Sequence, residues 1–383
     1  MRPELDRVIR SEPPPSVPFL DLWPSHAGLR RAILDEIADL IESGSFLGGP
    51  QVAAFEEAFA AYCGALYCIG LASGLDGLRL ALLAAGLEPG DEVIVPAATF
   101  VATFEAVTQV GGRPVPVDVV EADYCLTAEG VAEAVTSRTR AVVPVHLYGQ
   151  MAGMPPLLEL AEDTGIVIIE DACQAHGATR DGLRAGAVGR AGAFSFYPAK
   201  NLGAFGDAGA LVTNDADLAS RVRALREHGQ REKYRHEWEG YTARLDTIQA
   251  LVLLHKLPLL DGWNDQRREA ARLYANALNG VGDLRLPSVA PGSDPVWHLF
   301  VVRTADPEDL ASYLAKRGIR TGRHYPEPPH RSGAYAWLGL DAGAFPVTES
   351  LAAEAISLPI FPGMTEGQIG RVVEATEEYF RGG

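Results

Sequence analysis

Residues 193–203 of the chain read Ala-Phe-Ser-Phe-Tyr-Pro-Ala-Lys-Asn-Leu-Gly. The apolar first half predicts a buried strand, and the proline and glycine of the second half predict a loop directly after it. Lys200 lies in that loop. A lysine in a glycine-containing loop is usually a solvated surface residue, but ligands of an open α/β sheet bind where buried strands end. Lys200 is therefore a candidate for covalent catalysis.

Short apolar runs like this one alternate with helical patterns through the first two thirds of the chain. Such alternation predicts an α/β fold with a largely parallel sheet covered by helices on both faces. Helical spacing upstream also predicts two helices before the first strand, over residues 29–41 and 50–63. The predicted strands are residues 67–71, 92–95, 115–117, 141–145, 166–169, 193–196 and 210–213.

The 383-residue chain, 47% apolar, is long enough for a large and a smaller domain. Residues 1–16 are charged and rich in proline, which predicts an arm with little structure of its own. We expect a large domain over residues 17–260. A smaller α+β domain is expected over residues 261–383.

The amino-acid composition limits the classes of molecule that the protein can bind. A formal net charge of -17 disfavours nucleic acid and anionic membranes, and no apolar run reaches the roughly 20 residues that span a bilayer. The four cysteines are scattered, so they predict neither a zinc site nor a disulfide framework. We expect a cytoplasmic protein without a bound metal, and any phosphate ligand must be met by local groups.

Two more polar segments follow predicted strands. Ser73, Gly74 and Leu75 open a helix, and its free backbone N–H groups favour an anion such as phosphate. A glycine turn of this kind more often merely joins two elements. Asp171 follows the strand at 166–169, where burial demands a partner for its carboxylate. A protonated pyridine nitrogen is one such partner, and the cap of a following helix is the alternative.

These features together fit one cofactor, pyridoxal 5′-phosphate (PLP). Ser195 and Lys200 are close enough in sequence to reach the phosphate and the aldehyde of one ring. At this point the sequence resembles the DegT-type sugar-nucleotide aminotransferases over nearly its whole length. The motifs that carry the resemblance are PFLDL (18–22), PAATF (96–100), PVHLYGQ (144–150), EDACQAHG (170–177), SFYPAKNLG (195–203) and HYP (324–326).

The resemblance implies aminotransferase fold type I, with a mostly parallel seven-stranded sheet and a small C-terminal domain. It implies that Lys200 forms a Schiff base with the cofactor and then moves the proton between the substrate and cofactor carbons. Asp171 pairs with the pyridine nitrogen, and Gln174 hydrogen-bonds the ring hydroxyl. The remaining cofactor contacts are Gly74, Leu75 and Ser195 on the phosphate, and Phe100 stacked on the ring, for which ordinary core packing is the alternative.

Two positions depart from the family's pattern. Leu75 stands where Thr is usual, which removes one hydroxyl from the phosphate site, although the backbone N–H remains. Thr242 stands where an Asn commonly reaches the phosphate of the partner subunit's cofactor, so a shorter side chain has to make that contact.

The resemblance also implies a substrate. An amino donor, L-glutamate, aminates the cofactor, which then aminates a nucleotide-linked keto-sugar. Leu75 and the run 296–300 favour the branch that acts on a thymidine-diphosphate (TDP) 3-keto-6-deoxyhexose, as in antibiotic deoxysugar biosynthesis; a 4-keto-sugar is the alternative. The mixed basic and aromatic segment 228–236 is a candidate diphosphate site, with a solvated charged loop as the alternative. The predicted substrate residues are Lys233, Arg235, Tyr241, Arg244, His324 and Tyr325.

Two other functions are compatible with the fold. Sugar dehydratases related to this family replace the anchoring lysine with histidine, so Lys200 argues against that activity. A regulator that binds PLP without catalysis is the other alternative, because fold alone does not establish activity. The family resemblance further predicts a homodimer in which Thr242 and Arg244 reach across to the partner's site.

Overall fold

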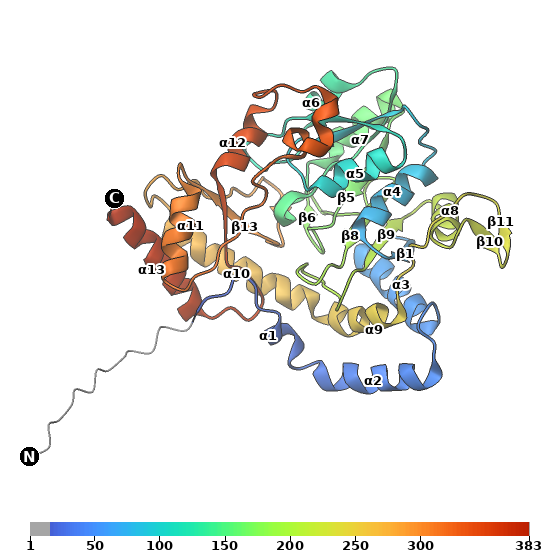
Figure 1. Cartoon of the computed structure of the whole chain (residues 1–383), viewed down its shortest axis with the longest axis horizontal. Coiled ribbons are helices and arrows are strands. Elements are labelled where there is room, and N and C mark those ends of the chain that lie inside the picture. Colours follow the sequence, from blue (N-terminus) through green and yellow to red (C-terminus); the bar gives the residue numbers. More distant parts are fainter. Residues whose placement is uncertain (1–15, 383) are drawn as a thin grey trace, which may run out of the picture.

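The computed structural model of the protein describes residues 16–382, so the predicted arm over residues 1–16 lies outside the described residues except for Ser16. A seven-stranded sheet in the order β1-β9-β8-β5-β4-β2-β3 forms the centre (Figure 1). The predicted α/β fold is confirmed. The strands are β1 (Tyr67–Leu71), β2 (Glu92–Pro96), β3 (Arg113–Val117), β4 (Thr139–Val142), β5 (Val167–Asp171), β8 (Ala191–Ser195) and β9 (Gly209–Thr213).

One strand of this sheet runs against the others. Strand β9 pairs antiparallel with both β1 and β8, whereas β8, β5, β4, β2 and β3 pair in parallel. Strand β4 ends at Val142, earlier than predicted, because Pro144 has no N–H to continue the ladder. The predicted mostly parallel sheet is therefore correct.

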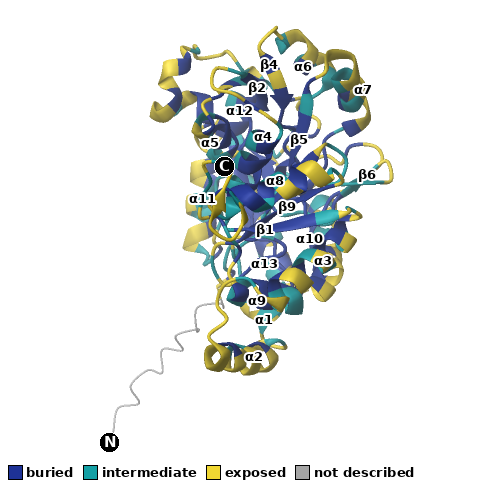
Figure 2. Ribbon diagram, turned by 90° about the vertical axis from the view of Figure 1, so that its right-hand side faces the viewer, coloured by how far each residue is buried: buried dark blue, intermediate teal, exposed yellow. Residues whose placement is uncertain are grey.

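Both faces of the sheet are covered, as expected for strands that read as continuous apolar runs. Figure 2 shows the strands as the buried centre of the molecule. Every residue of β2 and β9 is buried. One face packs against α4 (Gly74–Ala84), α5 (Val101–Gln109) and α8 (Ala216–Arg226), and the other against α3 (Pro50–Cys63), α6 (Ala128–Ala134), α7 (Met154–Thr164) and α9 (Thr247–Lys256).

The predicted N-terminal helices form, but they occupy different places. Helix α3 packs on β1 and α9, as its buried Phe55 and Phe59 require. The short α1 (Trp23–His26) and α2 (Arg30–Ser43) lie at the bottom of Figure 1, away from the sheet. Helix α2 contacts α9 through a small apolar cluster around Ile33 and leaves most of its surface exposed.

The C-terminal part has its own core. Its long helix α10 (Leu260–Leu278) packs with α11 (Pro307–Lys316) and α13 (Glu366–Arg381) around a strand pair, β13 (Phe300–Arg303) and β14 (Ala355–Leu358). The predicted boundary at residue 260 falls at the start of α10. Contacts cross it, because Val17 belongs to this core and β12 (Ser293–Asp294) pairs with β6 (Thr179–Arg180). The division into domains stays a prediction.

The remaining elements are short. Strand β7 (Leu183–Arg184) pairs with β6, and β10 (Gln230–Glu232) pairs with β11 (Arg235–His236) in a hairpin that projects from the molecule (Figure 1). Within residues 16–382, no helix is both long and apolar enough to cross a membrane. The short elements not yet described are α12 (Pro346–Glu354) and the 3₁₀ helices η1 (Leu147–Gly149), η2 (Leu257–Leu259), η3 (Pro329–Arg331) and η4 (Gly333–Leu338).

Candidate active site

A cavity of about 480 Å³ opens beyond the ends of β5 and β8. This is the sheet edge at which the sequence places its polar segments, because parallel strands present their carboxyl ends together. The cavity brings together most of the predicted site residues from five separate parts of the chain. The predicted residues that line it are Gly74, Leu75, Phe100, Asp171, Gln174, Ser195, Lys200, His324 and Tyr325.

Lys200 lies in a tight turn after β8. Its backbone N–H donates to Tyr197 O at 2.8 Å, and Gly203 is required because a Cβ there would lie 2.3 Å from Pro198 O. Burial lowers the pKa of Lys200, although Cys173 and Asp171 act in the opposite direction. A lowered pKa favours the neutral amine, which is the nucleophilic form.

Asp171 is the last residue of β5, and both of its carboxylate oxygens are held. Oδ1 accepts from the backbone N–H of Cys173 at 3.2 Å, and Oδ2 accepts from the Thr103 hydroxyl at 2.9 Å. The Thr103 oxygen lies 2.7 Å from that of Thr99, which lines the cavity. Turns rather than a helix follow Asp171, so helix capping, the alternative role, is wrong. Sequence reasoning missed Thr103, which lies 68 residues away on α5.

The start of α4 is built as an anion site. Ser73 caps the helix by accepting from Asp76 N at 3.0 Å, while the N–H groups of Gly74 and Leu75 are in the first turn, where helices provide no partner. A Cβ on Gly74 would lie 2.6 Å from Cys173 Sγ and 2.9 Å from Ser195 Cβ. The turn therefore packs directly on the end of β8, beside the Ser195 hydroxyl.

The opposite side of the cavity is aromatic. Gln174 accepts from Tyr148 N at 2.7 Å and donates from Nε2 to the Tyr325 hydroxyl at 3.1 Å, which leaves a second Nε2 hydrogen. Phe100 is half exposed, and its ring centroid lies 5.3 Å from that of Tyr325. Phe100 is thus a cavity residue and not part of the core. His324 stacks on Phe19 at 5.6 Å.

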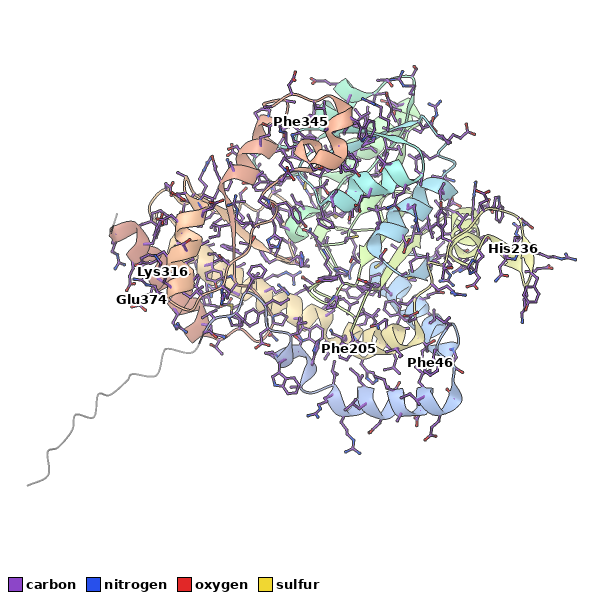
Figure 3. All side chains as sticks on the ribbon, viewed as in Figure 1. Phe46, Phe205, His236, Lys316, Phe345 and Glu374 are labelled. Carbon is purple, nitrogen blue, oxygen red and sulfur yellow. The ribbon has the colours of Figure 1, made fainter. Side chains whose placement is uncertain are left out.

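The predicted diphosphate residues lie elsewhere. Lys233 and Arg235 are exposed around the hairpin, whose outward direction is marked by His236 in Figure 3. Neither lines the cavity of this chain, nor do Tyr241, Thr242 and Arg244. These last three residues make contacts within their own chain. The Arg79 guanidinium lies 4.0 Å from the centre of the Tyr241 ring, Thr242 Oγ1 lies 3.3 Å from His228 Nε2, and Arg244 donates to Glu227 at 2.6 Å.

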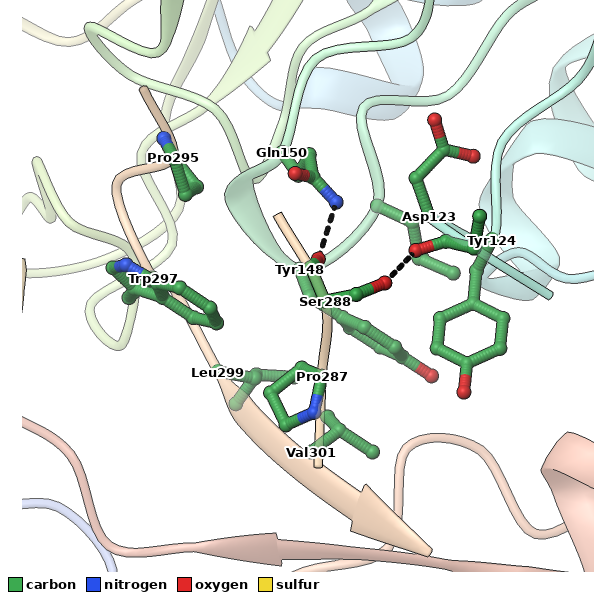
Figure 4. Close-up of a pocket in the computed structure, with 12 residues that line it drawn as sticks. Asp123, Tyr124, Tyr148, Gln150, Pro287, Ser288, Pro295, Trp297, Leu299 and Val301 are labelled. Carbon is green, nitrogen blue, oxygen red and sulfur yellow. Dashed lines mark hydrogen bonds between the residues drawn. The ribbon is translucent and has the colours of Figure 1, made fainter. Parts of the chain in front are cut away.

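A second cavity lies between residues 122–150 and the segments around Ser288 and Trp297 (Figure 4). Tyr148, Trp297 and Leu299 line it, and Gln150 Nε2 bridges it by donating to Ser288 O at 3.2 Å. At about 20 Å³ it has room for a water molecule and not for a sugar. The cavity of Lys200 is therefore the candidate active site.

The groups in that cavity fit PLP. An amine can bind its aldehyde, a held carboxylate can pair with its ring nitrogen, and a helix start with a neighbouring hydroxyl can bind its phosphate. Together with the sheet order, they define a PLP-dependent enzyme of aminotransferase fold type I. The chain belongs to the DegT/DnrJ/EryC1/StrS aminotransferase family, whose sequence profile matches residues 28–377. This family is PLP-dependent.

Individual relatives cover almost the whole chain. The dTDP-3-amino-3,4,6-trideoxy-alpha-D-glucose transaminase of Streptomyces venezuelae is 48% identical over 95% of this chain and 96% of its own length. The dTDP-3-amino-3,6-dideoxy-alpha-D-galactopyranose transaminase of Aneurinibacillus thermoaerophilus is 43% identical over 95% and 99%. The crystal structure of S. venezuelae DesV, 48% identical, superposes with a TM-score of 0.93 over 95% of this chain and 98% of that chain.

Proposed function

We propose that the protein transfers an amino group to C3 of a TDP-linked 3-keto-6-deoxyhexose, with PLP as the cofactor. The observation that carries the proposal is the Lys200 amine, whose pKa is lowered, in one cavity with the held carboxylate of Asp171. Because the family uses this pair with PLP, the cavity supports transamination. Lys200 itself argues against the dehydratase alternative.

The side chains have distinct tasks. When bound, PLP supplies an aldehyde and an electron-withdrawing ring. Lys200 anchors the cofactor and, once its amine is free, moves the proton at the reacting carbon, so one residue is both anchor and general base. Asp171 stabilises the protonated pyridine nitrogen, and Thr103 fixes the direction of that carboxylate. Gly74, Leu75 and Ser195 bind the phosphate.

The choice of a 3-keto-sugar is supported by the names of two relatives, which both describe 3-amino products. Leu75, at the start of α4, is the feature of this chain that agrees with that branch. We propose L-glutamate as the amino donor, on the family resemblance alone. His324 and Tyr325, which line the same cavity as Lys200, are the proposed sugar contacts.

We further propose a homodimer in which each cavity is completed by the partner's hairpin. Support comes from the basic hairpin, which is exposed and lines no part of its own chain's cavity. Thr242 and Arg244 are the proposed contacts across the interface. Large apolar side chains are also exposed on α2 and just after it, as expected of a covered surface. These are Leu34, Ile41, Phe46 and Leu47.

We place the protein in the cytoplasm. Support comes from the cysteines, which are free thiols scattered through the chain, as is typical of a reducing compartment.

The experiment that tests the function uses the purified enzyme with PLP, L-glutamate and either a TDP-linked 3-keto-6-deoxyhexose or its 4-keto isomer. We expect mass spectrometry to detect the amino-sugar from the 3-keto compound and little from the 4-keto compound. Loss of the visible PLP absorbance on adding glutamate alone reports the first half of the reaction. Turnover of the 4-keto isomer alone, or of neither sugar, contradicts the proposal, and light scattering that finds an active monomer contradicts the shared site.

A further inference from the structure

His298 lines the same cavity as Lys200 but has no task in the proposed function. It lies just before β13, in the segment that joins the small domain to the active site. Its Nδ1 is 3.2 Å from Oδ1 of Asn201, the residue directly after Lys200. The imidazole is thus fixed by the same loop that carries the reactive amine.

The hydrogen bonds of Asn201 decide which nitrogen of His298 carries the proton. Both hydrogens of Asn201 Nδ2 are donated to oxygens, to Asn264 Oδ1 at 2.9 Å and to Val296 O at 2.8 Å. Asn264 is oriented in turn, because its own Nδ2 donates to His176 O at 2.8 Å. Asn201 Oδ1 therefore faces His298, and since an amide oxygen only accepts, Nδ1 of His298 is the donor.

The other ring nitrogen is left as an acceptor. Burial, followed by the charge of Lys200, lowers the pKa of His298 well below its usual value, so the imidazole is neutral. With the hydrogen on Nδ1, Nε2 carries a lone pair, and it makes no hydrogen bond to any residue between 16 and 382. An acceptor of this kind in a ligand cavity is available to a donor from the ligand.

His324, the other histidine of the cavity, lacks this definition. Its Nδ1 lies 2.8 Å from the Ser357 hydroxyl, which can either donate or accept, so the tautomer of His324 is not fixed by its partner. The tautomer of His298 follows from the network alone.

We propose that Nε2 of His298 accepts a hydrogen bond from the sugar hydroxyl at C2, next to the reacting carbon C3. This inference rests on the proposed function. The amine of Lys200 has to reach the reacting carbon, so a group beside it meets the neighbouring positions of the sugar. The two relatives are named for a 3,4,6-trideoxy product and a 3,6-dideoxy product. Neither name indicates loss of the hydroxyl at C2. The C2 hydroxyl is thus the neighbouring donor that both products share.

Two substitutions separate the two ends of the ring. In His298→Asn, the side-chain amide nitrogen is as many bonds from Cβ as Nδ1 is, so the donor to Asn201 is retained and the Nε2 acceptor is lost. In His298→Gln, the amide oxygen is as many bonds from Cβ as Nε2 is, so an acceptor returns. The first variant keeps the contact that stabilises the loop, and the second restores the contact with the sugar.

The measurement is equilibrium binding by calorimetry to the holoenzyme loaded with pyridoxamine phosphate, which does not react with an amine. The ligands are a dTDP-linked 3-amino-6-deoxyhexose, its analogue without the C2 hydroxyl, and dTDP itself. We expect His298→Asn to bind the amino-sugar about five- to tenfold more weakly, the effect of one neutral hydrogen bond. Affinity for dTDP and for the 2-deoxy analogue should not change, and His298→Gln should recover part of the loss.

The outcomes are separable. If His298→Asn binds the amino-sugar as tightly as the unaltered enzyme, or loses the same factor for dTDP and the 2-deoxy analogue, the inference about C2 is wrong. If the unaltered enzyme binds dTDP and the amino-sugar no better than other nucleotides, the proposed function fails instead.

Discussion

Predicted ligand residues occur in two regions of the molecule. One is the cavity wall that the ends of the sheet strands form, and the other is the exposed hairpin of β10 and β11. Asp171 and Lys200 are held by hydrogen bonds at the ends of β5 and β8. Lys233 and Arg235 are exposed, and Arg235 forms an ion pair at 3.3 Å with Glu232 of the same hairpin. One chain therefore supplies the Lys200 amine, the Asp171 carboxylate and the start of α4 to a single cavity. The basic side chains of the hairpin line no part of that cavity, so the phosphate contact predicted for them requires another molecule.

Replacing Lys200 with alanine tests the wall most severely. We expect turnover to fall by at least about 10³-fold, because the variant loses both the anchor and the proton carrier. Formation of the amino-sugar, followed by mass spectrometry, measures the loss. Lys316→Ala, at an exposed position of α11 (Figure 3), is the matched control and should retain full activity. A Lys200→Ala enzyme that still turned over at a normal rate would remove the basis of the comparison.

His176, beneath Ser195, should make the wall sensitive to acid. Burial lowers the pKa of His176 to about 3, whereas an unfolded histidine titrates near 6.5. Above pH 6.5 neither state binds a proton there. Below it the unfolded state does, so the free energy of unfolding falls, by about 2 kcal/mol at pH 5.

The variant His176→Gln keeps an N–H donor for Ser195 O, 2.9 Å away, but cannot titrate. Urea unfolding at pH 7 and pH 5 should therefore show a smaller loss of stability in this variant than in the unaltered protein. His236→Gln on the exposed hairpin is the control and should lose as much as the unaltered protein. Equal losses in all three would mean that His176 does not contribute to acid sensitivity.

The substitution Thr103→Val tests how much PLP binding depends on the orientation of the Asp171 carboxylate. The substitution keeps the shape and removes one hydroxyl donor, so we expect PLP to bind about five- to tenfold more weakly. Absorbance titration of the apoprotein with PLP gives the dissociation constant. Thr108→Val on the same helix loses the contacts of its hydroxyl with the backbone carbonyls of Phe104 and Glu105 and with the Tyr335 hydroxyl, none of which involves Asp171, and should bind PLP normally. If both variants bind PLP equally well, Thr103 does not position Asp171.

The smallest effect is expected from the hairpin. Replacing Lys233 and Arg235 together with alanine should raise KM for the sugar nucleotide about three- to fivefold at low salt, without a change in kcat, because exposed charges contribute little each. The difference should disappear in high salt. Arg272→Ala on α10, an exposed arginine paired with Glu269, is the control. A fall in kcat at constant KM would place the hairpin in the chemistry and erase the contrast.

Much of the wall could be predicted from the sequence because its signals are local. The β-branched run Val167–Ile169 comes just before Glu170 and Asp171, and an apolar run comes just before the loop of Lys200, so each marks a strand and its carboxyl end. The reversed direction of β9 has no such signal, since an apolar run reads the same in either direction.

The partners of the site residues were not predictable in the same way. Thr103 on α5 and His298 before β13 lie 68 and 98 residues from Asp171 and Lys200 in the chain, and neither residue type is unusual in its own segment. The partners of Glu170 were equally unpredictable, because the sequence does not show that its carboxylate contacts His146 Nε2 and three backbone N–H groups. The position of the hairpin was unpredictable for another reason: its basic composition predicts an anionic ligand but does not show where the hairpin lies relative to the cavity.

The antiparallel course of β9 bears on how the loop of the reactive amine is held. A parallel strand would need a crossover through a covering helix, whereas here the chain doubles back at one edge of the sheet. Phe196 N donates to Ala208 O and Ala204 N to Phe196 O, both at 2.7 Å, so the segment with the reactive amine is a short loop fastened at both ends. The backbone on either side of Lys200 is therefore tied together next to β9, which limits how far the reactive amine can move from the cavity.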